Sequence, residues 1–183
     1  MIEIMQDPLD QFFADVGTRT LSTGEFLFHA GDPVQQVGLL RAGQVMLVRH
    51  GADGHRMILH RAEPGDLLAE ASVWSDVYHC DAVARSPAEV AMVSRSEFRA
   101  ALARDPALAE GWARRLARAV QAARLRAEIR GLRTVSERMD AWLGADGRMP
   151  DRGRWQELAE ELGVTREALY RELSRRRAGE LSR

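Results

Sequence analysis

Four residues near the C-terminus have the types and spacing needed to read the edges of DNA bases. They are Arg166, Glu167, Tyr170 and Arg171, on the outward face of an expected helix. An arginine makes bidentate contacts with guanine, and a glutamate accepts from the amino group of cytosine. The alternative is an ordinary solvent-exposed surface, because Glu167 and Arg171 have the spacing of an ion pair along a helix. The two interpretations are compatible, because an ion pair with Glu167 would also keep the Arg171 side chain in place.

A helix-turn-helix over residues 154–177 is the element that would position these side chains. Gly163 is expected to end the first helix, because glycine adopts the left-handed conformation easily. Val164 would fill the corner, and Thr165 is a good N-cap for the second helix, whose first turn enters the major groove. A charged helical hairpin could match parts of this pattern by chance. The small and apolar residues of the inner faces are Leu158, Ala159, Leu162, Leu169 and Leu173.

The charge of the chain is divided between two halves. Residues 1–104 hold 9 arginines and 14 carboxylates, a charge of -5, and residues 105–183 hold 17 arginines and 13 carboxylates, a charge of +4. All 26 basic residues are arginine, which excludes lysine nucleophiles and is largely explained by a GC-rich gene. The second half is therefore expected to face a polyanion. Candidate phosphate contacts are Arg152, Arg154, Arg175, Arg176 and Arg177.

Short apolar runs separated by glycine and proline predict an antiparallel β domain over residues 1–104. Turn residues recur every 8–12 positions, as in sandwiches and barrels. Ala52-Asp53-Gly54 between two runs predicts a hairpin turn. The runs are Phe26–Phe28, Val37–Leu40, Val45–Val48, Met57–Leu59, Leu67–Leu68 and Val90–Val93.

Helices are expected to follow the β domain. Residues 94–103 predict a short helix with Ser96 as its N-cap, and Asp105-Pro106 begins a long one over residues 105–132. The long helix carries small and apolar residues at spacings of 4, 3 and 4, which predicts a dimer seam; packing on its own β domain is the alternative. A DNA-binding domain with a further helix at residues 134–143 would occupy residues 133–183. The seam residues are Trp112, Leu116, Ala119 and Ala123.

This organisation resembles the Crp/Fnr family of bacterial transcription regulators. The resemblance rests on the run 31–45, on the cassette 64–72 and on Thr165-Arg166-Glu167 with Arg171. It implies an α+β fold: an N-terminal antiparallel β jelly roll of the cyclic nucleotide-binding type, a long dimerisation helix and a C-terminal winged helix-turn-helix. The wing here is expected to be truncated or absent, with residues 178–183 beginning its first strand. The resemblance further implies a cytoplasmic homodimer that binds palindromic TGTGA-like operators on double-stranded DNA and contacts RNA polymerase.

The same resemblance places an effector pocket in the β domain. In members that bind cyclic AMP, a glutamate accepts from the ribose and an arginine neutralises the cyclic phosphate. Glu70 matches the glutamate, but Ala69 replaces a glycine and Cys80-Asp81 stands where an Arg-Ser pair is expected. A carboxylate near the phosphate is repulsive, so cyclic AMP is disfavoured and the effector stays unidentified. The expected pocket comprises Gly65, Asp66, Leu68, Glu70, Ala71, Ser72, Cys80 and Asp81.

A single cysteine limits the cofactors that one chain can hold. Cys80 alone excludes an internal disulfide and a cysteine-ligated iron–sulfur cluster. His79-Cys80 could offer an axial haem ligand, but Asp81 works against the electropositive setting that a thiolate needs. The favoured alternative is a buried, neutral cysteine that packs within a strand.

A sensor module and an enzyme are the two alternatives to a DNA-binding regulator. A sensor module that acts through protein partners, with weak or vestigial DNA binding, is the alternative that the expected loss of the wing favours. An enzyme is not predicted, because the sequence has no paired carboxylates in a glycine-framed site, no phosphate-binding Gly-Lys loop and no Ser/Cys–His arrangement. No apolar run approaches the roughly 20 residues that span a bilayer, so no membrane partner is expected.

Overall fold

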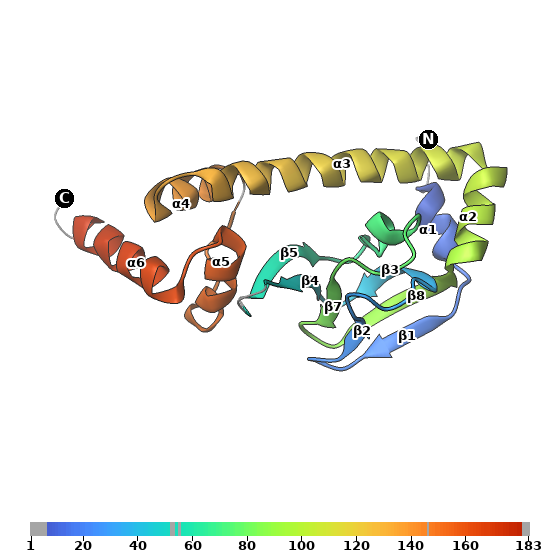
Figure 1. Ribbon diagram of the computed structural model, residues 1–183, viewed down its shortest axis with the longest axis horizontal. Coiled ribbons are helices and arrows are strands. Elements are labelled where there is room, and N and C mark those ends of the chain that lie inside the picture. Colours follow the sequence, from blue (N-terminus) through green and yellow to red (C-terminus); the bar gives the residue numbers. More distant parts are fainter. Residues whose placement is uncertain (1–6, 52–53, 55, 146, 181–183) are drawn as a thin grey trace, which may run out of the picture. The chain divides into compact units, whose positions relative to one another are not determined.

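The structure is a computed structural model that describes residues 7–51, 54, 56–145 and 147–180. Its contacts form two compact units, one of residues 1–49 with 59–119 and the other of residues 50–58 with 120–183. Figure 1 labels the elements of both. The middle of the expected hairpin turn, Ala52 and Asp53, lies outside the described residues.

Two four-stranded sheets form the β domain, as the spacing of the apolar runs predicts (Figure 1). Each strand pair whose register is described is antiparallel. The first sheet has the order β1 (Thr18–Leu21), β8 (Ala88–Ser94), β3 (Gln36–Ala42) and β6 (Leu67–Leu68). The second has the order β2 (Phe26–Phe28), β7 (Asp81–Ala84), β4 (Val45–His50) and β5 (Arg56–Ala62).

Strand β3 is buried on both faces, which explains its unbroken apolar run. Leu40 belongs to a core cluster with residues of both sheets. Val37 and Leu39, on the other face, pack with helices α1 (Pro8–Phe13) and α2 (Arg95–Arg104). Phe13 and Phe98 are fully buried there, with ring centroids 6.0 Å apart. Helices α1 and α2 thus cover the face of the first sheet that carries Val37 and Leu39.

Helix starts follow local capping rules, with one correction to the expected boundaries. The N-cap of α2 is Ser94, whose hydroxyl accepts from the amide of Glu97 at 3.2 Å. The expected cap, Ser96, lies inside the helix and its hydroxyl is 3.2 Å from that of Ser94. Both serines satisfy the capping pattern, and the end of β8 selects the earlier one. Helix α3 (Pro106–Gly131) begins as predicted, because the Asp105 carboxylate accepts from two amides of its first turn.

Three helices and a short 3-10 turn form the rest of the second unit. Helix α4 (Val135–Gly144) starts with a capping box between Thr134 and Glu137. The turn η2 (Arg152–Arg154) leads into α5 (Trp155–Leu162), and α6 (Arg166–Glu180) follows. The expected wing strand is wrong for residues 178–180, which continue α6. Residues 181–183 lie outside the described residues.

Candidate nucleic-acid interface and effector pocket

The turn between α5 and α6 has the geometry of a helix-turn-helix. Gly163 ends α5 in the left-handed conformation, with φ 64° and ψ 43°. The hydroxyl of Thr165 accepts from the amide of Ala168 at 3.2 Å, so Thr165 caps α6. Leu158, Leu162, Leu169 and Leu173 all lie in one buried cluster with Ala159. The sequence pattern of small, glycine and leucine positions therefore corresponds to two packed helices.

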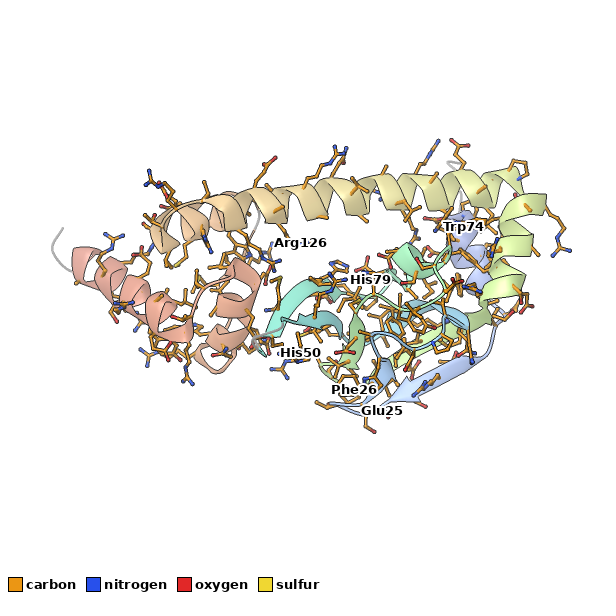
Figure 2. The ribbon with its side chains drawn as sticks, viewed as in Figure 1. Glu25, Phe26, His50, Trp74, His79 and Arg126 are labelled. Carbon is orange, nitrogen blue, oxygen red and sulfur yellow. The ribbon has the colours of Figure 1, made fainter. Side chains whose placement is uncertain are left out.

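Arginines from α3 and α4 hold the C-terminal end of α5. The Arg130 Nε donates to the carbonyl of Glu161 at 2.9 Å. Arg138 donates to the carbonyls of Leu162 at 3.1 Å and Gly163 at 2.8 Å. A cation at this end donates hydrogen bonds to carbonyls that have no partner within the helix. It also interacts favourably with the negative end of the helix dipole. Burial lowers the pKa of Arg126, which Figure 2 labels, and of Arg130, although Glu161 opposes this for both.

The candidate base-reading residues are exposed at the start of α6. Arg166, Glu167 and Arg171 are exposed, and Tyr170 is half-buried. Arg166 donates to the Tyr170 hydroxyl at 3.3 Å, and its guanidinium lies 5.1 Å from the ring centroid. Tyr170 in turn contacts Trp155 edge to face at 5.1 Å. Neither Glu167 nor Arg171 is ion-paired within the part of the chain that the structure describes, so the alternative Glu167–Arg171 pair is not formed there.

The five candidate phosphate contacts fall into two groups. Arg154 pairs with Glu157 at 3.4 Å, while Arg175 and Arg176 pair with Glu172 at 2.8 Å and 2.6 Å. These three arginines stabilise the domain internally. The guanidinium groups of Arg152 and Arg177 lie instead 5.6 Å and 5.1 Å from the centroid of the Trp155 ring. Trp155 thus positions two arginines that are better suited to contact phosphates.

The ion pairs of Glu172 predict acid-sensitive stability. Hydrogen bonds from Arg175 and then Arg176 lower the pKa of this buried carboxyl to about 2, against an opposing effect of burial. The stabilisation is present above the ordinary pKa of 4.5 and is lost as the pH falls from there towards about 2. Because Arg175 is exposed, we expect Glu172→Gln to lower stability at pH 7 by only about 1–2 kcal/mol. Urea titrations from pH 7 to pH 2.5 should show the difference from wild type closing. Glu128→Gln, on the exposed face of α3, should change little at any pH, and a constant difference for Glu172→Gln would contradict the account.

The cassette of residues 64–72 comprises a turn after β5, the short strand β6 and a 3-10 segment. Gly65 has a positive φ of 97°, and Leu68 is fully buried. The Asp66 carboxylate lies 3.2 Å from His60 Nε2 and accepts from the amide of Glu63 at 2.9 Å. Asp66 thus shapes the turn. The 3-10 segment η1 (Glu70–Ser72) follows, preceded by Ala69 in the left-handed conformation.

Ala69 predicts a local strain that glycine would relieve. Among the residues with side chains that the structure describes, it alone has a positive φ without being glycine, at 70°. The left-handed conformation costs about 1–2 kcal/mol for such a residue, and losing one buried methyl costs about 0.8 kcal/mol. We therefore expect Ala69→Gly to stabilise the protein by up to about 1 kcal/mol. Ala71→Gly, at an exposed position of η1, should destabilise it by about 0.5–1 kcal/mol. Urea denaturation midpoints test both, and equal losses would rule out the strain.

Glu70 presents a buried carboxylate oxygen without a partner. Its Oε2 atom has no hydrogen-bond donor among the described residues. Burial raises the pKa of Glu70, and the nearby Asp66 adds to the rise, while backbone amides and His60 act in the opposite sense. Ser72 is buried, and its hydroxyl lies 3.0 Å from His79 Nδ1 (Figure 2). Ala71 is exposed. Glu70 is therefore the residue of the cassette that is ready to accept a hydrogen bond.

Cys80 and Asp81 lie at the start of β7, with Cys80 just before the strand and Asp81 as its first residue. Cys80 is buried, and burial followed by the charge of Glu70 raises the pKa of its thiol to about 11. It is thus a neutral thiol, in line with the packing alternative and not with a thiolate ligand. The Asp81 carboxylate accepts from the amide of Ala30 at 2.8 Å and lies 3.6 Å from His29 Nδ1. Asp81 is thus held at the Ala30 turn, and its place in the effector pocket stays a prediction.

These residues do not fit an anionic cyclic phosphate. A neutral thiol occupies the expected position of the arginine. Arg49 donates to the carbonyl of His79 from two nitrogens, at 2.7 Å and 3.1 Å, and with partial burial of the ring it lowers the pKa of His79. That guanidinium is already engaged at the backbone. The cassette offers an acceptor, Glu70, in place of a phosphate-binding cation.

The four residues of the expected dimer seam lie in different surroundings. Trp112 contacts Phe98 and Trp74, with centroid distances of 6.3 Å and 6.5 Å, so it packs on its own β domain as the alternative held. Leu116 is half-buried, whereas Ala119 and Ala123 are exposed. Val120, which is not among the expected seam residues, is 48% exposed between those alanines. In the sequence, Val120 is marked by its place in a stretch of the long helix where arginines alternate with small residues.

A protein-family model matches most of the β domain. Residues 18–105 match the family model of the cyclic nucleotide-binding domain. A comparison with curated proteins found no match. Within the described residues, no helix combines the length and apolar character required to cross a membrane.

Solved structures share the fold along most of the chain, and two of the three named below are described as regulators. The global regulator CLP of Xanthomonas campestris, described as responsive to c-di-GMP, is 22% identical with a TM-score of 0.79, covering 94% of this chain and 92% of that one. FixK2 of Bradyrhizobium japonicum is 23% identical with a TM-score of 0.76, covering 90% and 86%. A CRP/FNR-family transcriptional regulator of Thermus thermophilus is 20% identical with a TM-score of 0.69, covering 87% of each chain. The resemblance to the Crp/Fnr family is thereby confirmed at the level of the fold: residues 18–105 match the family model of the cyclic nucleotide-binding domain, and the chain shares its fold with these solved structures.

Proposed function

We propose that this chain is a DNA-binding transcription regulator that acts as a homodimer on a palindromic, TGTGA-like operator. The observation that carries the proposal is the exposed first turn of α6, where Arg166 and Glu167 follow a capped helix start. Recognition helices contact bases with this part. The regulators with the same fold support the assignment.

Side chains of α6 and of η2, which precedes α5, would have different roles in DNA binding. Arg166, held by the Tyr170 hydroxyl, and Arg171 would contact guanine, and Glu167 would accept from cytosine. Arg152 and Arg177, stacked near Trp155, would contact phosphates on either side. Base contacts then specify the sequence, and phosphate contacts fix the register.

The exposed apolar stretch of α3 supports a dimer. Ala119, Val120 and Ala123 lie on the surface next to the half-buried Leu116. A second copy of this helix would bury them in a two-fold interface, and a two-fold dimer requires inverted half-sites about one helical turn apart. The palindrome in the proposed operator follows from this symmetry.

An effector that donates a hydrogen bond would suit the β domain better than an anion. Glu70 Oε2 is buried and has no donor among the described residues, so a hydroxyl or ammonium group of a ligand would satisfy it. Such a ligand would act by changing the relative population of two orientations of the recognition helices. RNA polymerase as a further partner and a cytoplasmic location belong to the same proposal.

A sensor module that acts through protein partners is the second candidate. The observation that favours it is the continuation of α6 through residues 178–180, where a wing strand was expected. Residues 178–180 would then contribute no wing strand to phosphate binding. This candidate predicts weak DNA binding without sequence preference.

The dependence of DNA affinity on salt distinguishes the two candidates. Fluorescence anisotropy with a labelled TGTGA palindrome should give a linear fall of log K with log salt, with a slope of about -0.9 for each phosphate contact. Arg152→Ala with Arg177→Ala should reduce this slope while preserving the preference over a scrambled duplex. No preference for the palindrome at any salt concentration would favour the protein-partner candidate.

A further inference from the structure

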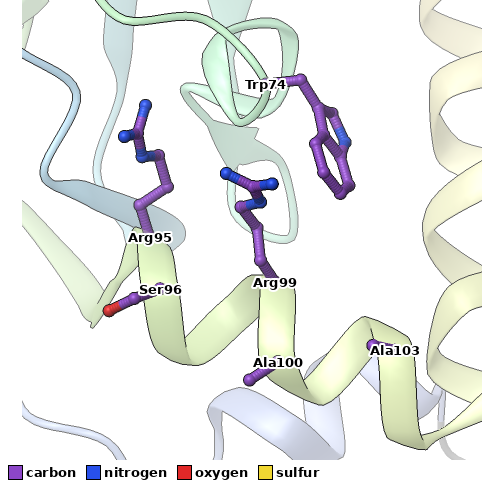
Figure 3. Close-up of a pocket in the computed structure, with 6 residues that line it drawn as sticks. All are labelled: Trp74, Arg95, Ser96, Arg99, Ala100 and Ala103. Carbon is purple, nitrogen blue, oxygen red and sulfur yellow. The ribbon is translucent and has the colours of Figure 1, made fainter.

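A groove on the β domain lies between α2 and the segment that follows η1, apart from the helix-turn-helix (Figure 3). Its volume is about 430 Å³, and it is open along one side. The lining residues are Trp74, Arg95, Ser96, Arg99, Ala100 and Ala103. None of them belongs to the expected effector pocket or to the DNA interface.

Trp74 places a large aromatic surface at the groove. It is 62% exposed, although its ring also lies 6.5 Å from the ring of Trp112. Tryptophan is enriched at protein interfaces, because it combines a large apolar ring with a hydrogen-bond donor. Beside it, Ala100 and Ala103 leave space for an incoming side chain.

Two arginines give the groove a positive charge. The Arg99 guanidinium lies 4.1 Å from the centroid of the Trp74 ring and makes no hydrogen bond to other described residues. Arg95 donates from one nitrogen to the carbonyl of Ser75, which leaves its other nitrogens available. Both side chains point from α2 towards the Trp74 segment (Figure 3). Glu97 on the same helix does not offset this charge at the groove, since its carboxylate accepts from the Ser94 hydroxyl at the helix start.

We propose that this groove docks an acidic segment of a partner protein that carries one aromatic or aliphatic anchor. A guanidinium held against a tryptophan can receive a carboxylate with two parallel hydrogen bonds. The anchor would lie on Trp74 beside the alanines. The open side suits an extended chain, whereas small molecules prefer sites that enclose them. Tryptophan and arginine are also the residues that contribute most to protein interfaces.

Selection from a random library tests the proposal without assuming a sequence. A phage library of 12-residue peptides would be selected on the wild-type protein and, in parallel, on the Trp74→Ala/Arg99→Ala double variant. We expect the wild type to enrich peptides with several Asp or Glu residues around one apolar residue, and the double variant to lose them. No enrichment, enrichment of peptides without acidic residues, or equal enrichment on the variant would overturn the proposal.

Direct affinities sharpen this result. For the most enriched peptide, labelled with fluorescein, we expect at least about tenfold weaker binding to Arg99→Ala and an intermediate loss for Arg99→Lys, which keeps the charge without the planar fork. Arg114→Ala, an exposed arginine of α3 outside the groove, is the matched control and should bind like wild type. Circular dichroism checks folding, and the single variants serve if the double variant is unfolded. Operator binding by the groove variants should be unchanged, so failure here is distinct from failure of the proposed function.

Discussion

Replacing Arg166 with alanine is expected to abolish specific operator binding while the protein remains a folded dimer. The side chain is exposed and makes its hydrogen bond and its cation–π contact with Tyr170, so its loss should leave the buried leucine cluster intact. A bidentate arginine–guanine contact contributes about 1–3 kcal/mol of discrimination, and a dimer loses two. The preference for the operator over a scrambled duplex should therefore fall by about 2–6 kcal/mol. Anisotropy titrations with both duplexes measure this.

Two variants accompany this measurement. Tyr170→Phe removes only the hydroxyl that accepts from Arg166, so a smaller loss of preference is expected. Arg114→Ala should bind like wild type, and light scattering should give the same mass for all variants. If Arg166→Ala kept the sequence preference of the wild type, Arg166 would have no role in reading bases.

Replacing Gly43 with alanine is expected to destabilise the β domain more than any surface change. Gly43 links β3 to β4 with a positive φ of 81°. An added Cβ would overlap the backbone carbonyl of Pro87 and lie 2.7 Å from the Ala88 Cα. Backbone atoms cannot rotate away, so overpacking of about 1–3 kcal/mol adds to about 1–2 kcal/mol for the left-handed conformation. Urea denaturation should thus show a loss of about 2–5 kcal/mol.

Gly24 provides a matched control for the conformational part of this effect. Its φ of 84° is similar, but an added Cβ would meet no atom within 4 Å. Gly24→Ala should therefore lose only about 1–2 kcal/mol. Equal losses in the two variants would show that the close approach of the Pro87 segment does not matter.

Much of the fold follows from local patterns that tertiary contacts do not override. The apolar runs Val37–Leu40 and Val45–Val48 are strands because turn residues bound them on both sides. The helix-turn-helix is predictable because Gly163 and Thr165 impose a turn and a cap whatever surrounds them. Spacing alone also identified Leu169 and Leu173 as buried.

The remaining features depend on contacts that sequence spacing does not encode. The Asp81 carboxylate is held by the Ala30 amide, which is distant along the chain. Helix α1 was missed although Asp7-Pro8 repeats the start signal of α3, because six residues show no helical period. Trp74 and Arg99 come together only through the fold. Such long-range pairings need the structure.

The sequence preference of the wild-type protein tests the central proposal most directly. Full-length protein would be incubated with a library of random duplexes, and bound DNA would be amplified and sequenced over successive rounds. The account predicts enrichment of two inverted TGTGA-like half-sites with centres about one helical turn, roughly 34–36 Å, apart, as two-fold symmetry requires. Enrichment of a single unpaired site, or a bound pool that stays random in sequence, would contradict it.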